Sequence, residues 1–409
     1  MKRALFGLWT LCLLVLVSIP SSADVPVRVV RFDDVKPPSA RLSMTFEGVG
    51  LDPQERVYAY LCGTGTEPDC HLVRWNPKTN VKQYLGSLNA AARRAGNLGP
   101  NRYWPKPEYI VKGHTHVWYL DGKMWVGTMN AHDYRDMSVI RGGHLMAYDL
   151  ATGIITDHSQ WQPKGVFKDR GGFYAIPVYP PKNVVVGIGV PNSTGCRVIV
   201  YNPRTRVMRR IPGVPAGTDN GQLAGRDAAV LPDGRVLYQC GGADTAFGMY
   251  NINTGENKVT PFKTQYVLTS GLAVTSDGRK AYATDLKNIY EFNLQTNGQR
   301  VLTTLDPAGA IRQTSPAVLS LDEQKLYYVI NQSTADGGAW VEDLYEYNIV
   351  TGVRTKLMNL KSAIGLAKVS GSHNTALTGK IYFVFRPSDH AGILEVDVSA
   401  RTGPAPSRR

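Results

Sequence analysis

A short tag that recurs six times constrains the fold of this chain more than any other feature. Each copy has an aromatic residue, then Asp or Asn, two variable residues and Thr, usually followed by Gly or Asn. The copies are WNPKTN (75–80), YDLATG (148–153), YNPRTR (201–206), YNINTG (250–255), FNLQTN (292–297) and YNIVTG (347–352). Such a tag is typical of a strand that ends in a tight turn, because the Asn or Asp side chain binds the backbone ahead and Gly or Asn accepts positive φ.

Between the tags, apolar runs alternate with hairpin signals. Asp121-Gly122, Asp233-Gly234 and Asp277-Gly278 each join two such runs, and Asp-Gly suits the twist of paired strands. Successive tag threonines lie about 42 to 73 residues apart, which is the scale of four strands plus loops. Helical periodicity is weak throughout, and one short helix is expected at residues 89–95.

These repeats predict an all-β fold, a seven-bladed β-propeller of four-stranded antiparallel blades. We expect a strand from Val25 to Phe32 to close the ring with the last blade, which removes exposed sheet edges. The chain resembles secreted seven-bladed β-propellers over nearly the whole of its length after residue 23. The seven units span about 40–85, 113–160, 171–211, 222–263, 266–304, 312–360 and 361–399.

Both ends of the chain are expected to lie outside the propeller. A charged start, an apolar run from Ala4 to Ile19 and small residues after it are typical of a secretory signal peptide over residues 1–23. No later run approaches the length of a membrane span. A single propeller domain is expected over residues 24–399, followed by a disordered basic tail at residues 400–409. We therefore expect a secreted or periplasmic protein.

The charge of the exported chain indicates an anionic partner. Of the 46 lysines and arginines, two leave with the signal peptide, so 44 face 33 aspartates and glutamates and the net charge is near +11. This charge attracts polyanions at long range. Export separates the protein from intracellular nucleic acid, so we expect an anionic polysaccharide or oligosaccharide as the partner of a monomer.

Four cysteines remain after the signal peptide: Cys62, Cys70, Cys196 and Cys240. An even number in an oxidising compartment permits disulfides, and four cysteines allow three connectivities. Cys62 and Cys70 bracket the loop CGTGTEPDC, so a Cys62–Cys70 disulfide is the simplest pairing. Four unpaired core cysteines are the alternative.

The stretch Gly113–His144 holds four of the eight histidines. Lys112–His116 leads into the innermost strand of blade two, and residues 130–143 join its second and third strands. In a propeller both kinds of loop lie on one face, which we call the rim, whereas the Asp-Gly hairpins lie on the other face. If Gly113 begins the innermost strand, alternation places His114 and His116 on one side of it.

The rim is expected to gather His, Tyr, Arg and Asp from three neighbouring blades. These residue types suit β-elimination on a uronic acid, since Arg pairs with the carboxylate while His or Tyr removes and donates protons. The predicted catalytic residues are His114, His116, His132 and Tyr174. The predicted substrate-binding residues are Arg135, Arg141, Arg170, Arg226 and Asp133.

This cluster resembles the sites of secreted polysaccharide lyase propellers. Ulvan lyases use two histidines with a Tyr and an Arg, for which His114 or His116, His132, Tyr174 and Arg170 are the counterparts. Oligogalacturonate lyases hold a metal with an H-x-H pair, another His and a Gln. His114-Thr-His116 matches that pair, but Val111 stands three residues upstream instead of Gln.

A divalent metal is a second hypothesis for the same cluster. His114, His116 and His132 would supply three nitrogens to Zn, Mn or Ca, with Asp133 as a carboxylate ligand. Such a metal could itself bind the uronate carboxylate, so the two hypotheses are compatible.

Two other interpretations stay open. Gly-His before a blade is also a structural element of propellers, so His114 could bond within its own blade, and His144 is expected to be structural. The whole protein could instead be a non-enzymatic exported propeller that binds a glycan or a protein on the rim. We favour the enzyme, because His, Arg and Asp outnumber apolar residues in the rim loops.

Overall fold

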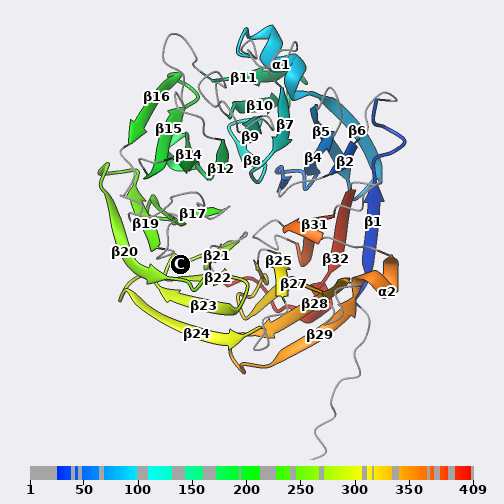
Figure 1. Cartoon of the computed structure of the whole chain (residues 1–409), viewed down its shortest axis with the longest axis vertical. Helices are drawn as coiled ribbons and strands as arrows, with labels where there is room; N and C mark the ends of the chain where they lie inside the picture. The colour runs from blue at the N-terminus through cyan, green and yellow to red at the C-terminus, as the bar shows by residue number, and fades with distance from the viewer. Residues whose placement is uncertain are drawn as a thin grey trace, which may run out of the picture.

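Seven antiparallel sheets stand around a central axis in the computed structural model and form a closed β-propeller (Figure 1). The structure describes residues 25–37, 42–44, 48–63, 69–98, 109–130, 143–159, 172–192, 195–211, 227–239, 246–266, 271–305, 311–315, 317–333, 340–365, 369–372, 378–385 and 392–406. The all-β, seven-bladed fold expected from the tags is confirmed, and each of the seven predicted units overlaps one blade.

Four blades have an innermost strand broken into two pieces that both pair with the second strand. Blade one has β2 (Leu42–Met44), β3 (Val49–Leu51), β4 (Val57–Gly63), β5 (Cys70–Asn76) and β6 (Val81–Ser87). Blade two has β7 (Ile110–Gly113), β8 (Trp118–Leu120), β9 (Lys123–Asn130), β10 (Leu145–Asp149) and β11 (Ile155–Asp157). Blade three has β12 (Phe173–Ala175), β13 (Val178–Tyr179), β14 (Val184–Asn192), β15 (Gly195–Asn202) and β16 (Val207–Ile211). Blade six has β25 (Ile311–Thr314), β26 (Val318–Leu319), β27 (Lys325–Ser333), β28 (Trp340–Asn348) and β29 (Arg354–Asn359).

The other three blades have four strands each, with an unbroken innermost strand. Blade four has β17 (Ala228–Val230), β18 (Arg235–Gln239), β19 (Ala246–Asn251) and β20 (Asn257–Lys263). Blade five has β21 (Leu272–Val274), β22 (Lys280–Thr284), β23 (Asn288–Asn293) and β24 (Gly298–Thr304). Blade seven has β30 (Val369–Ser372), β31 (Lys380–Phe385), β32 (Gly392–Asp397) and, as its outermost strand, β1 (Val27–Arg31).

Strand β1 closes the ring, as the sequence predicts. It runs antiparallel to β32, with Val27 opposite Val396 and Arg31 opposite Gly392. Just after this strand, Phe32 is buried in the apolar cluster that also contains Trp75 of blade one. The Arg28 guanidinium donates to Glu395 at 2.8 Å and lies 4.4 Å from the centre of the Trp75 ring. The closing strand therefore joins blade seven to blade one by both apolar and charged contacts.

All six tags adopt the turn expected of them. In each, the Asn or Asp side chain accepts hydrogen bonds from the backbone N–H groups two and three residues ahead, as Asn348 does from Val350 and Thr351 at 2.9 Å. The sixth residue has positive φ in every copy: Asn80, Gly153, Arg206, Gly255, Asn297 and Gly352. Arg206 adopts this conformation at φ 56° although it is neither Gly nor Asn. The tags thus act as local turn signals that end the third strand of a blade.

Helices are few and short in the described part of the chain. The helix expected at residues 89–95 is α1 (Leu88–Arg94), which begins at Ser87, whose side chain accepts from the Ala90 N–H. The others are α2 (Leu360–Ile364) and the 3-10 turns η1 (Pro180–Lys182) and η2 (Ser399–Arg401). Among the described residues, no helix is long and apolar enough to cross a membrane.

A second repeated element, not singled out from the sequence, occupies the outer part of three blades. Lys-x-Tyr on the second strand faces a Glu on the third, and the Tyr and Glu stand directly opposite each other. The three sets are Lys280, Tyr282 and Glu291 in blade five, Lys325, Tyr327 and Glu346 in blade six, and Lys380, Tyr382 and Glu395 in blade seven. An arginine completes each set: Arg300 at 2.9 Å, Arg401 at 2.9 Å and Arg28 at 2.8 Å from the carboxylate.

The C-terminal segment begins differently from the expected disordered tail. Arg401 pairs with Glu346, and the Thr402 hydroxyl accepts from the Asp322 N–H at 3.3 Å. The Gly403 N–H donates to the Asp322 carboxylate at 2.7 Å. Residues 401–403 therefore belong to blade six, because a carboxylate of that blade holds each end of the segment. Residues 407–409 lie outside the described part.

Candidate functional site

The described part of the candidate site lies where the innermost strand of blade two is interrupted. Gly113 is the last residue of β7, so the expectation that it begins the strand is wrong, and His114 to Val117 lie between β7 and β8. Alternation along a strand therefore does not place His114 and His116. Their side chains are 3% exposed in each case.

Thr115 explains the interruption. Its hydroxyl accepts from the Gly127 N–H of β9 at 3.0 Å and donates to the His116 carbonyl at 2.9 Å. The Thr115 side chain thus takes the place of the backbone carbonyl that would bind the Gly127 N–H in a regular strand pair. A Cβ on Gly127 would stand 2.8 Å from both Thr115 and Phe173, closer than real Cβ contacts. Glycine at 127 thus allows blade three to approach this segment.

His114 and Tyr174 bring blades two and three together. Their ring centres are 5.0 Å apart at an angle of 36°, and Tyr174 is 6% exposed. Tyr174 lies at a register shift in β12, between Phe173 and Ala175. Such bulges re-aim a side chain. The two predicted acid–base residues therefore meet in a buried contact.

His116 faces a carboxylate from blade four. Its Nε2 lies 3.7 Å from Oδ2 of Asp227, and the two side chains are 3% and 1% exposed. Asp227 also accepts from the Ala228 N–H at 2.7 Å and the Leu272 N–H at 2.9 Å. These bonds hold the carboxylate between blades four and five, so that it can orient the His116 ring. Asp227 was not among the predicted site residues, although it directly follows the predicted Arg226 in the sequence.

The remaining predicted rim residues lie outside the described part of the chain. These are His132, Asp133, Arg135, Arg141, Arg170 and Arg226. The structure therefore joins His114, His116 and Tyr174 with Asp227, and the substrate-binding set stays a prediction. The blades that carry the cluster follow one another around the centre, with β7, β12 and β17 innermost (Figure 1).

The metal hypothesis also depends on His132. Among the described residues, no group of three or more His, Cys, Asp or Glu side chains is arranged to hold a metal ion. His114, His116 and Asp227 accordingly do not form such a set by themselves. Zn, Mn or Ca binding with His132 as a third ligand stays a prediction, and no catalytic step is built on it.

His144 belongs to the scaffold of blade two. Its Nδ1 lies 2.6 Å from Oδ2 of Asp157, and both side chains are fully buried. Asp157 accepts in turn from the Ser159 N–H at 2.9 Å. Burial opposes ionisation of Asp157, but the charge and hydrogen bond of His144 hold its pKa below the usual value. The pair ties the start of β10 to the end of β11, which is the structural role expected for His144.

Cys62 and Cys70 stand directly opposite each other on β4 and β5. Both are buried, and their sulfur atoms are 3.5 Å apart, beyond the length of about 2.05 Å of a disulfide. The Gly113 N–H donates to the Cys70 sulfur at 3.0 Å, which connects this thiol to the segment that carries His114. The strand register thus places Cys62 and Cys70 side by side, and the disulfide between them stays a prediction.

Two surface grooves among the described residues lie away from this cluster. One is lined mainly by β14, β15 and β16 of blade three with Ile252 of blade four, and another lies beside Pro180, Pro181 and Pro232. His114, His116, Tyr174 and Asp227 line neither groove.

Comparison with known proteins identifies the fold. No family model matches this chain, and no curated protein matches it by sequence. The Myceliophteria thermophila Cps50 (Swd1) β-propeller domain is similar with a TM-score of 0.57 and 10% identity, over 91% of this chain and 100% of that one. The RRP9 WD40 repeats are similar with a TM-score of 0.54 and 10% identity, over 93% and 98%. An oligogalacturonate lyase in complex with manganese is similar with a TM-score of 0.51 and 13% identity, over 92% and 97%. At such identities the likeness shows the propeller fold and no particular activity.

Proposed function

We propose that this protein is an exported carbohydrate-active enzyme that cleaves an anionic, uronic-acid-containing polysaccharide by β-elimination. The observation that carries the proposal is the buried contact between His114 and Tyr174, 5.0 Å apart, beside the His116–Asp227 pair. Two groups able to exchange protons thus lie together at the centre of the propeller. An oligogalacturonate lyase is among the structures of similar fold, which supports a lyase on this scaffold.

In this reaction a base removes the C5 proton of the uronate and an acid protonates the leaving glycosidic oxygen. The C5–H and C4–O4 bonds break, and the C4–C5 double bond forms between them. We assign the base to the neutral His114 imidazole and the acid to the Tyr174 hydroxyl, since both residue types serve these roles in enzymes. Asp227 orients His116, which would face the substrate carboxylate with the arginines predicted on the rim.

Ultraviolet absorbance of the unsaturated product tests the proposal directly. The folded protein is incubated with polygalacturonate, alginate, glucuronan and ulvan. We expect His114→Gln and Tyr174→Phe to lower kcat/KM by about 10²- to 10⁴-fold on the cleaved polymer, as loss of an acid or base does. Absence of unsaturated product from every polymer would overturn the lyase proposal.

A matched histidine–tyrosine pair in blade one supplies the control. His71 Nδ1 lies 3.0 Å from the Tyr84 hydroxyl on the outer strands β5 and β6, away from the central axis. His71→Gln and Tyr84→Phe should leave kcat/KM within about twofold of wild type, because neither group can reach a substrate at the centre. An equal loss in both pairs would mean that the effect is structural.

The second candidate is an exported propeller that binds an anionic glycan without cleaving it. Asp227 is 1% exposed and accepts two backbone hydrogen bonds. A carboxylate with a purely structural role would be held in the same way, and this favours the second candidate. Calorimetric titration with the same four polymers separates the two. Binding without unsaturated product would favour the binding propeller, whereas turnover lost in Tyr174→Phe would exclude it.

A further inference from the structure

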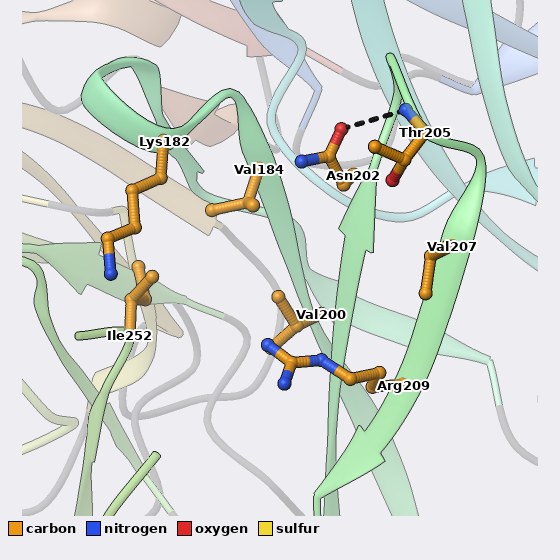
Figure 2. Close-up of a pocket in the computed structure, with 8 residues that line it drawn as sticks. All are labelled: Lys182, Val184, Val200, Asn202, Thr205, Val207, Arg209 and Ile252. Carbon is orange, nitrogen blue, oxygen red and sulfur yellow. Dashed lines mark hydrogen bonds between the residues drawn. The ribbon is translucent and has the colours of Figure 1, made fainter. Parts of the chain in front are cut away.

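A groove of about 480 Å³ opens where the sheet of blade three meets blade four. Its lining residues are Lys182, Val184, Val200, Asn202, Thr205, Val207, Arg209 and Ile252. Figure 2 shows the side chains of Lys182 and Arg209 reaching inward from opposite sides, with Val200 and Ile252 between them. Val184, Val200 and Ile252 are buried, so the floor is apolar. Both charged residues of the lining are cations.

The groove occupies the position that the Tyr–Glu–Arg set fills in other blades. In blade five, Tyr282 is opposite Glu291, which is opposite Arg300. In blade seven, Tyr382 is opposite Glu395, which is opposite Arg28. In blade three the same register reads Val186, Val200 and Arg209. Blade three therefore keeps the arginine but has valine in place of both the tyrosine and the glutamate.

These two replacements leave space and an unmatched charge. Valine is smaller than tyrosine or glutamate, and two of the three positions, Val200 and Arg209, line the groove. No described residue forms an ion pair or a side-chain hydrogen bond with Arg209 or Lys182. Arg300 and Arg28, by contrast, each pair with the glutamate of their own blade.

The tyrosine of the following blade gives a second sign of the missing carboxylate. Burial raises the pKa of Tyr347 beside blade five, where Arg300 lowers it and Glu291 raises it. Burial also raises the pKa of Tyr250 beside blade three, where Arg209 lowers it and no carboxylate contributes. Arg209 and Arg300 thus occupy equivalent places, and only the second has an internal anion.

We propose that this groove binds a small organic carboxylate with an apolar body, whose carboxylate pairs with Arg209 in the place of the absent glutamate. Arg presents a planar fork that matches a carboxylate, and Lys182 supplies a second positive charge. The apolar body lies on Val184, Val200 and Ile252, and the volume is within the range of small-molecule sites. Among the described lining residues there is no aromatic ring on which a sugar would stack, which favours an apolar body over a uronate. This site is separate from the proposed lyase site and does not depend on it.

Octanoate is the probe, and its binding to the full chain is measured by isothermal titration calorimetry. Octanamide has the same apolar body without the charge, and galacturonate has the carboxylate on a polar body. We expect octanoate to bind at least about tenfold more tightly than either, because octanamide lacks the charge-assisted pair and galacturonate lacks the apolar body. Equal affinity for octanamide or galacturonate would refute the assignment of the ligand class.

Substitutions on β16 locate the site. Arg209→Gln should weaken octanoate binding by at least about tenfold, whereas Arg210→Gln removes the same charge from the opposite side of the strand and should change it by less than twofold. Val200→Glu restores the glutamate found in blades five and seven and should abolish octanoate binding while the protein stays folded. No octanoate binding to wild type, or equal binding to Arg209→Gln, would overturn the proposal.

Discussion

Replacing Glu346 by Gln should destabilise the propeller by about 2 kcal/mol, roughly twice the cost of the same change at Glu291. Glutamine can still accept the hydrogen bond that the Tyr327 hydroxyl donates at 3.0 Å. The cost therefore comes from the cations left without a counter-charge. At Glu346 these are Arg401 and Lys325, with side chains 28% and 18% exposed. At Glu291, Arg300 and Lys280 are 61% and 41% exposed, so water screens most of the loss.

Urea unfolding of both variants, followed by intrinsic fluorescence, measures this difference. Burial opposes ionisation of Glu346, but Arg401 and Lys325 outweigh it and hold its pKa below the usual 4.5. Because the folded pKa is lowered, the stabilisation is complete above about pH 4.5 and is lost as the pH falls through the folded value. The gap between wild type and Glu346→Gln should close over that acidic range. Equal costs at the two positions, or a gap that persists in acid, would refute the reasoning.

Three further outcomes are expected. His144→Ala should lower the free energy of unfolding by about 3 kcal/mol, because it leaves the fully buried Asp157 carboxylate without its partner, and a thermal shift no larger than that of a surface variant would contradict this. Phe32→Ala should cost about 3 to 4 kcal/mol and expose β1 to proteolysis, since Phe32 is 1% exposed where the ring closes. Burial lowers the pKa of His158 to about 4 from 6.5, so stability should fall as the pH drops from 6.5 to 4. His158→Asn should flatten that decline in a pH series of melting temperatures, and an unchanged slope would speak against this assignment.

The architecture could be predicted because its signals are local. A tag such as 347–352 carries its own turn, with Asn348 bonding to the residues just ahead, and hairpins such as Asp277-Gly278 join neighbouring strands. The spacing of these signals predicted the seven blades, and the apolar run from Val25 to Phe32 predicted the closing strand observed at Val27–Arg31.

The site and the charged sets resisted prediction because they depend on register and on contacts between blades. Thr115 interrupts the strand of blade two by bonding to Gly127, which no periodicity reveals. Asp227 reaches His116 from two blades away. The Lys-x-Tyr triplets are visible in the sequence, but the glutamates opposite them are identified only once the strands are paired. The predicted arginines of the rim lie outside the described residues.

The strand that closes the ring makes the protein prone to exchange between copies. Arg28 and Glu395 are 367 positions apart, yet they meet in one sheet of blade seven. Their pairing is intramolecular, with an effective concentration on the order of millimolar for a linked segment. At protein concentrations below this value, β32 of each ring pairs with β1 of the same chain. Above it, β1 of a second copy competes for β32. Refolding at high protein concentration should therefore yield strand-swapped dimers and chains, and dilution before refolding should favour single closed rings.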